Sequence, residues 1–210
     1  MGEQFGFFIT IWFKFTFLFA PFFVLTMFLS MTTGAHNAER RKLALRVTGA
    51  IAVLSVAVFL FGNIVFSLLG ITLDAFRVGA GVLLFLSAVQ LVQSKRSAEM
   101  PRGVGEGNDG DHDDIAVVPL AMPIVIGPAV IGTLMVFGSE YSNIGQKGIG
   151  IVALLFATLT TGIILLLGTH IERVLGKRGL RVMSKITGLI LSAMAAQMIL
   201  SGVKNFIQLP

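Results

Sequence analysis

Six stretches of this chain are apolar over the length that a helix needs to cross a bilayer, about 20 residues for about 30 Å of hydrocarbon. The six predicted spans are residues 15–32, 44–69, 75–93, 115–137, 148–169 and 186–207. Only 13% of the 210 residues are charged, against about 25% in soluble domains. The sequence therefore predicts an all-α membrane protein with six transmembrane helices, forming a single transmembrane domain over residues 1–210.

Basic residues are divided unequally between the two predicted sides of the membrane. Twelve lie in the three loops of one side: Arg40, Arg41, Lys42, Arg46, Lys95, Arg96, Arg102, Arg173, Lys177, Arg178, Arg181 and Lys185. The other side, termini included, has four: Lys14, Arg77, Lys147 and Lys204. Because short cytoplasmic loops carry an excess of Lys and Arg, we expect a multi-pass protein of the cell inner membrane with both termini outside.

The apolar segment 5–13 precedes the first predicted span and contains the only tryptophan, Trp12. We interpret it as an interfacial approach to the membrane, with Lys14 extending to the boundary. The first residues lack the basic region that begins a signal peptide, so none is expected.

Several function classes are excluded by what the residues offer. The net charge of +5 does not indicate nucleic-acid binding, because the basic residues sit in short loops between apolar runs. There is no cysteine, and His36, His112 and His170 have no partner at metal-ligand spacing. No catalytic arrangement, P-loop or dinucleotide motif is present. We therefore expect neither an enzyme nor a metal or cofactor site.

The two halves of the chain correspond at a constant offset of 107 residues. Pro21 matches Pro128, Thr26 matches Thr133, and the pattern G-x-x-L-x-x-x-A-x-Q begins at Gly81 and recurs at Gly188. Repeat one is predicted over residues 1–93 and repeat two over 115–210. The glycine-rich, acidic segment 94–114 is interpreted as a cytoplasmic linker rather than a cation site. Three spans per repeat, an odd number, predict two inverted repeats, an arrangement common in secondary transporters.

Prolines interrupt spans one and four at corresponding places. Span four contains Pro119, Pro123, Gly127 and Pro128, and span one contains Pro21. Simple kinks are the alternative, but we favour broken helices whose free backbone groups line a binding site. Opposed helix ends suit a small zwitterion, a solute of net neutral charge. The predicted substrate-binding residues are Ala20, Pro21, Phe22, Phe23, Thr26, Pro123, Ile126, Gly127, Pro128, Ala129 and Thr133.

Asp74 and Arg77 stand at the start of span three, three residues apart on one helix face. The pair is interpreted as a helix cap with a boundary arginine, and a role as a gate is a second possibility. No carboxylate lies at depth in a span, and Asp74 beside Arg77 is expected not to be an obligatory proton carrier. The coupling ion, a proton or sodium, is left open.

Three segments resemble the MarC family of integral membrane proteins. They are the run from Gly70 to Gly81, the run from Val117 to Pro123 with Gly127-Pro128, and the end from Gly188 to Gly202. The resemblance implies six spans and transport of small neutral amino acids such as glycine and alanine, described as proton-dependent in relatives. Relatives typically show Asn-Pro-x-Gly-x-x-Pro in span one. Here Ala20, Phe23 and Thr26 replace the Asn, the Gly and the second Pro, which leaves open a half-site that is smaller, more apolar or inactive.

These observations predict a secondary transporter that moves a small neutral amino acid across the inner membrane by alternating access. Two alternatives remain. An exporter of drugs or other amphipathic solutes would have a wide apolar cavity. A non-transport accessory membrane protein would bind no solute at its broken helices. The sequence leaves the oligomeric state open.

Overall fold

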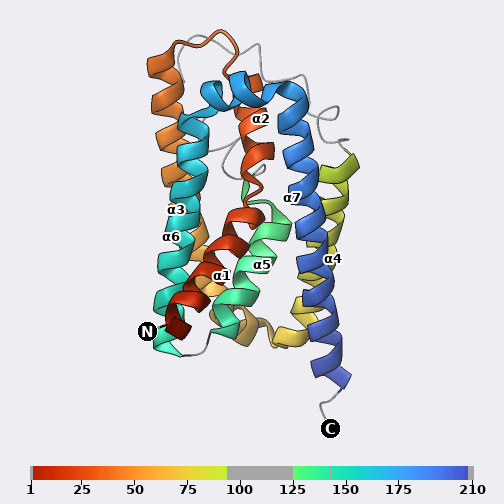
Figure 1. Cartoon of the computed structure of the whole chain (residues 1–210). Helices are drawn as coiled ribbons and strands as arrows, with labels where there is room; N and C mark the ends of the chain where they lie inside the picture. Colours follow the sequence, from red (N-terminus) through yellow and green to blue (C-terminus); the bar gives the residue numbers. More distant parts are fainter. Residues whose placement is uncertain (1, 94–124, 142, 208–210) are drawn as a thin grey trace.

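The computed structural model describes residues 2–93, 125–141 and 143–207, and within these ranges the chain forms seven helices. They are α1 (Gly2–Leu18), α2 (Pro21–Met31), α3 (Asn37–Leu69), α4 (Leu73–Gln93), α5 (Pro128–Glu140), α6 (Ile144–Leu166) and α7 (Gly168–Ile207). The helices form an elongated bundle (Figure 1). The start of α1 and the end of α7 lie at the same end of the bundle, called here the terminal end.

Five helical stretches among the described residues are long and apolar enough to cross a membrane: Gln4–Met31, Asn37–Gly62, Leu73–Gln93, Ile144–Leu166 and Gly168–Ile207. The fold is therefore all-helical and typical of an integral membrane protein. The predicted fourth span is not among the five. Residues 115–124 lie outside the described residues, and α5 has 13 residues, about 20 Å of helix, which is too short to cross alone. The fourth span therefore remains a prediction.

The first crossing begins earlier than the sequence predicted. Segment 5–13 is part of α1 and packs against α6, so its interpretation as an interfacial approach was wrong. The Phe8 and Phe156 ring centroids are 5.6 Å apart, and Trp12 Nε1 donates a hydrogen bond to Thr160 Oγ1 at 3.2 Å. Lys14 consequently lies within α1, and its place relative to the membrane boundary stays a prediction. The crossing can hold 28 residues because two half-helices replace one straight helix.

The predicted loop containing Arg173 to Lys185 is helical. It belongs to α7, which is interrupted at Gly176, where φ is 65° and ψ is 169°. The first two turns of α7 lie across the end of the bundle, and the rest runs along it (Figure 1). The sequence reading treated clustered charge as a loop, although Lys and Arg are good helix formers whose long side chains reach water from a helix.

The caps explain where several helices begin and end. Glu39 Oε2 accepts a hydrogen bond from the His36 N–H at 3.2 Å at the start of α3, and Gly70 ends α3 in the left-handed conformation. Asn143 caps α6 by accepting from the Gly145 N–H at 3.3 Å. These short-range bonds satisfy backbone groups that a helix end leaves free.

Buried aromatic and aliphatic side chains of α1, α2, α3, α5 and α6 form the interior, including Phe15, Phe28, Phe59 and Leu134. Many large apolar side chains point outward, such as Leu60 and Phe61 on α3, Phe85 on α4 and Phe156 on α6. An outer surface of this kind fits a lipid environment.

Glycines set the closest helix approaches. A Cβ atom on Gly138 of α5 would lie 1.9 Å from the backbone oxygen of Phe59 on α3, and one on Gly62 would lie 2.7 Å from the backbone oxygen of Met135. Membrane helices associate closely where small residues let their backbones meet. The crossing of α3 and α5 therefore depends on residues without a side chain.

The pairing of α4 with α7 is reciprocal. A Cβ on Gly81 would lie 3.2 Å from the Ala195 backbone oxygen, and one on Gly188 would lie 2.9 Å from the Ala88 backbone oxygen. Gly81 and Gly188, like Ala88 and Ala195, are partners in the 107-residue offset. The buried positions also correspond: Arg77, Ala80, Gly81, Leu84, Ala88 and Leu91 on α4, and Ser184, Thr187, Gly188, Leu191, Ala195 and Met198 on α7. Six pairs of positions related by the offset are therefore buried on both helices.

Candidate functional site

The first crossing is broken between α1 and α2, as Pro21 predicted. Ala20 has φ 46° and ψ 58°, the left-handed region, and is the one non-glycine residue with positive φ in the described chain. Pro21 lacks an N–H, and a proline disfavours helical backbone in the residue before it. The Ala20 N–H bonds to Phe17 O at 2.9 Å, and the Phe23 and Val24 N–H groups bond to Ala20 O. Backbone groups at the break are therefore largely satisfied within the chain.

The second interruption lies at the start of α5. Ile126 and Gly127 are not helical, Gly127 is the N-cap with φ −75° and ψ 173°, and Pro128 is the first helical residue. The first helical bond is donated by the Ile131 N–H to Gly127 O at 3.0 Å. The earlier N–H groups of α5 have no acceptor within their own helix. Pro119 and Pro123 lie outside the described residues.

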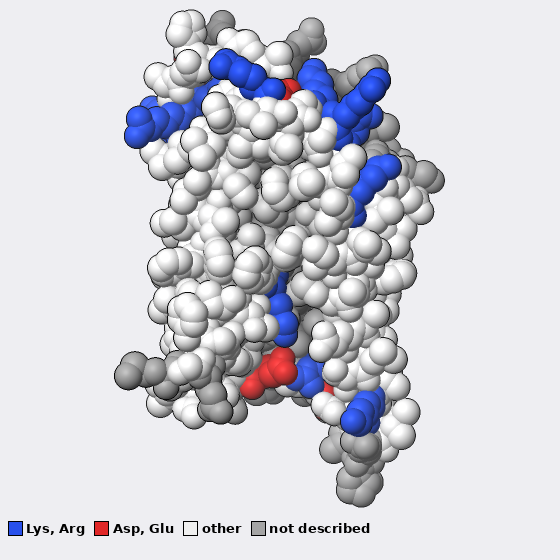
Figure 2. Space-filling model, in the orientation of Figure 1, with Lys and Arg blue, Asp and Glu red and all other residues white. Residues whose placement is uncertain are grey.

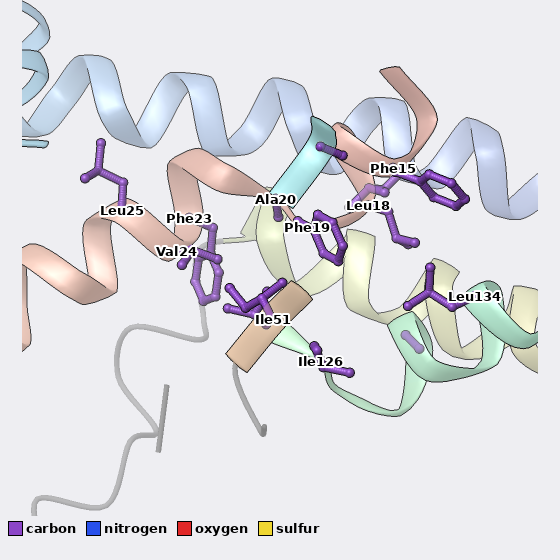
Figure 3. Packing of buried hydrophobic residues seen from close by; sticks show 14 of the residues in the cluster. Phe15, Leu18, Phe19, Ala20, Phe23, Val24, Leu25, Ile51, Ile126 and Leu134 are labelled. Carbon is purple, nitrogen blue, oxygen red and sulfur yellow. The ribbon is translucent and has the colours of Figure 1, made fainter. Parts of the chain in front are cut away.

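Residues of both interruptions are buried in the interior. Ala20, Phe23, Ile126 and Ala129 belong to one cluster of buried residues, against which Phe22 packs. In Figure 3, Ala20, Phe23 and Ile126 lie around Ile51 of α3. Pro21 and Gly127 are buried, whereas Pro128 is exposed. The structure thus places Ala20, Phe23, Ile126 and Ala129 in the same apolar core. The pockets described below are lined by other residues.

The two predicted hydroxyls are in matched local settings. Thr26 Oγ1 donates to Phe22 O at 2.9 Å, and Thr133 Oγ1 donates to Ala129 O at 2.7 Å. Thr133 is fully buried, and Thr26 is half-buried. Because each hydroxyl hydrogen is already used by its own helix, each oxygen can offer a ligand only an acceptor. Their role in substrate binding stays a prediction.

Arg77 links three helices near the terminal end. Its Nη1 lies 3.0 Å from Asp74 Oδ1, as the spacing predicted, and its Nη2 lies 3.3 Å from Glu140 Oε1 on α5. Asn205 of α7 donates to Asp74 Oδ1 at 3.2 Å. Arg77 is 9% exposed. No residue near Arg77 in the chain pointed to Glu140 as a partner, because Glu140 lies 63 positions away. The only available clue was that a buried arginine normally has carboxylate partners.

A groove of about 390 Å³ opens beside this network, called here the charged groove. Its charged and polar lining comes from α1, α4, α5 and α7: Lys14, Arg77, Glu140, Gln197, Ser201, Lys204 and Asn205. Figure 2 shows blue and red atoms within a hollow of the otherwise white lower face. Sequence reasoning missed this groove because it placed Lys14 at the boundary and treated Asp74 and Arg77 as an isolated pair.

The left-handed Ala20 can be tested by a matched pair of glycine substitutions. Alanine in this conformation costs about 1–2 kcal/mol, so Ala20→Gly relieves strain that offsets the lost methyl group and the added chain entropy. Ala153→Gly, at a buried position within α6, has no strain to relieve and costs about 1 kcal/mol or more. We expect a melting temperature near wild type for Ala20→Gly and a fall of roughly 2–4 °C for Ala153→Gly. Equal falls would contradict the left-handed assignment.

Comparisons with known proteins identify similar chains. The family described as "MarC family integral membrane protein" matches residues 5–207. The UPF0056 membrane protein MJ1677 of Methanocaldococcus jannaschii is 35% identical over 186 residues, covering 88% of this chain and 90% of that protein. The UPF0056 inner membrane protein YhgN of Escherichia coli is 33% identical over 183 residues, covering 85% and 87%. These names give a membrane location and no substrate. No solved structure matches the chain.

Proposed function

The chain belongs to the MarC family of integral membrane proteins, and on that premise we propose that it is a secondary transporter of small neutral amino acids, of the size of glycine or alanine. One observation carries the proposal. Two helix interruptions, at Ala20-Pro21 and at Gly127-Pro128, come from corresponding places in the two halves of the chain, and both contribute buried residues to the same hydrophobic core. Interrupted helices at the centre of paired repeats are where secondary transporters bind substrate.

The proposed architecture is six spans in two inverted repeats, with residues 115–124 completing the fourth span before α5. The reciprocal contacts of α4 with α7 support it, because Gly81 against Ala195 and Gly188 against Ala88 are the two copies of one contact. Alternating access then corresponds to movement of one repeat against the other around the buried interruptions. The packed cluster around Ala20 and Ile126 is interpreted as the site in a closed, substrate-free conformation.

Two pockets of the described residues suit a small polar solute better than a large amphipathic one. The charged groove measures about 390 Å³, and a second pocket near Arg40 and Arg41 measures about 400 Å³. Both lie at the lower end of the roughly 300–1,000 Å³ found for ligand sites, and both carry charged residues. A drug exporter requires a wider apolar cavity.

The proposed orientation in the inner membrane places both termini outside the cytoplasm. Nine described basic residues lie away from the terminal end: Arg40, Arg41, Lys42, Arg46, Arg173, Lys177, Arg178, Arg181 and Lys185. In Figure 2, Lys and Arg gather at the upper end. The excess of Lys and Arg on the cytoplasmic side of membrane proteins assigns this end to the cytoplasm. We expect a C-terminal alkaline phosphatase fusion to be active and a C-terminal green fluorescent protein fusion to be dark. The opposite pair of results would reverse the orientation.

Uptake by purified protein tests the transport proposal. In proteoliposomes we expect time-dependent accumulation of radiolabelled glycine or alanine, competed by the unlabelled amino acid and absent from protein-free vesicles. A pH gradient and a sodium gradient, imposed separately, identify the coupling ion. Gradient-driven uptake should persist in Asp74→Asn if Asp74 is not an obligatory proton carrier. Absence of uptake and exchange for every neutral amino acid, with folded protein in the vesicles, would favour an accessory role.

A further inference from the structure

Lys14 is a cation inside a candidate membrane-crossing segment, and none of the described carboxylates pairs with it. It lies within the crossing Gln4–Met31 and is half-buried. Among the described residues, no Asp or Glu oxygen lies within ion-pair distance of its Nζ, whose one described contact is the Phe137 ring at 5.6 Å. A charge at depth in a membrane protein is costly and marks a path or site for a ligand. The aromatic contact offsets only part of that cost.

Glu140 lines the same groove, and one of its two carboxylate oxygens has a described ion-pair partner. Its Oε1 pairs with Arg77, and its Oε2 has no described partner. Arg77 itself is occupied by Asp74 and Glu140. The charged groove therefore contains two lysines without a described ion pair, the half-buried Lys14 and the exposed Lys204, and one carboxylate oxygen, Glu140 Oε2, without a described partner. Phe137 lies one turn before Glu140 on α5, and of the two lysines it is Lys14 whose Nζ lies over the Phe137 ring. Lys14 and Glu140 are therefore neighbours along one side of the groove.

We propose that the charged groove binds the zwitterionic form of a small α-amino acid, with its carboxylate on Lys14 Nζ and its ammonium on Glu140 Oε2. Charge-assisted hydrogen bonds at both ends provide the recognition. Phe137 and Met198 line the space for a short apolar side chain. This inference rests on the proposed function and adds to it a second, peripheral subsite toward the terminal end, distinct from the buried interruptions.

Binding and transport are measured separately so that each can fail alone. Equilibrium binding of radiolabelled alanine is measured on the full-length protein in nanodiscs. Propionate, which lacks the ammonium, and ethylamine, which lacks the carboxylate, serve as competitors. We expect each to compete at least tenfold more weakly than unlabelled alanine. Lys14→Met keeps the aliphatic stem without the charge. It should raise the Kd of alanine about tenfold or more, the equivalent of one charged hydrogen bond.

Two variants separate recognition from structure. Lys14→Arg retains the charge and should bind alanine within about threefold of wild type. Lys147→Met removes a basic residue of α6 outside the groove lining and should bind as wild type does. An unchanged Kd in folded Lys14→Met, or no alanine binding by wild type, would overturn the subsite. Lys14-dependent binding without uptake would support the subsite and refute transport. Alanine uptake by Lys14→Met with an unchanged KM would support transport and refute the subsite.

Discussion

Gly138→Ala is expected to destabilise the protein by about 3 kcal/mol or more, at or above the upper end of ordinary overpacking. The added Cβ would lie 1.9 Å from the Phe59 backbone oxygen and 2.9 Å from its carbonyl carbon. Neither atom can rotate away as a side chain would, so α3 and α5 must move apart. A fall of roughly 6–12 °C in melting temperature should follow, measured by thermal denaturation of the purified protein in detergent.

Gly148→Ala provides the matched control. Gly148 lies in α6, and a Cβ there meets no atom within 4 Å. Alanine is favoured over glycine in a helix by about 1 kcal/mol, so this variant should melt slightly above wild type. A shift of about 2 °C or less in melting temperature corresponds to a change below about 1 kcal/mol. A Gly138→Ala protein with so small a shift would show that α3 and α5 are not in backbone contact.

Arg77→Met is the second substitution with a large expected effect. It leaves Asp74 and Glu140 facing each other without the guanidinium that joins them. Breaking a buried ion pair costs about 3–5 kcal/mol. Because the Glu140 side chain is 45% exposed, we expect a smaller loss of about 2 kcal/mol. The measurement is the free energy of unfolding, or the melting temperature where unfolding is irreversible.

A double-mutant cycle isolates the electrostatic part of this effect. Arg77→Met combined with Glu140→Gln removes one of the two stranded carboxylates. The double variant should therefore be less destabilised than the sum of the two single variants, by about 0.5 kcal/mol or more. Arg77→Lys keeps the charge but cannot hold two carboxylates in the planar geometry of arginine, and should fall between wild type and Arg77→Met. Strict additivity would mean that Arg77 and Glu140 do not interact.

Features encoded by neighbouring residues were predicted well from sequence. The spans at 44–69 and 75–93 lie within α3 and α4, because long apolar runs meet clear caps such as Gly70. The break at Pro21 was confirmed because proline removes a donor from its own helix. The matched faces of α4 and α7 follow the G-x-x-L-x-x-x-A-x-Q pattern, which sequence reading identified without knowing that the two copies touch.

Features that depend on distant residues were missed. The first residues of α1 pack against α6, far along the chain, and α7 bends at Gly176 and continues as a helix on both sides of it. The pairing of Arg77 with Glu140 and the position of Lys14 over Phe137 join residues more than 60 positions apart. No local periodicity encodes such contacts. The composition of the site was therefore easier to predict than the place where its charges meet.

The antiparallel contact of α4 with α7 also has an electrostatic consequence. Each helix carries a macrodipole, equivalent to about half a positive charge at its N-terminus and half a negative charge at its C-terminus. The glycine contacts at Gly81, Gly188 and Gly202 bring the two backbones close along much of their length, and Figure 1 shows the helices running in opposite directions. The opposed dipoles attract each other in lipid, where little solvent screens them. The close contact thus lets α4 and α7 each offset the electric field of the other helix.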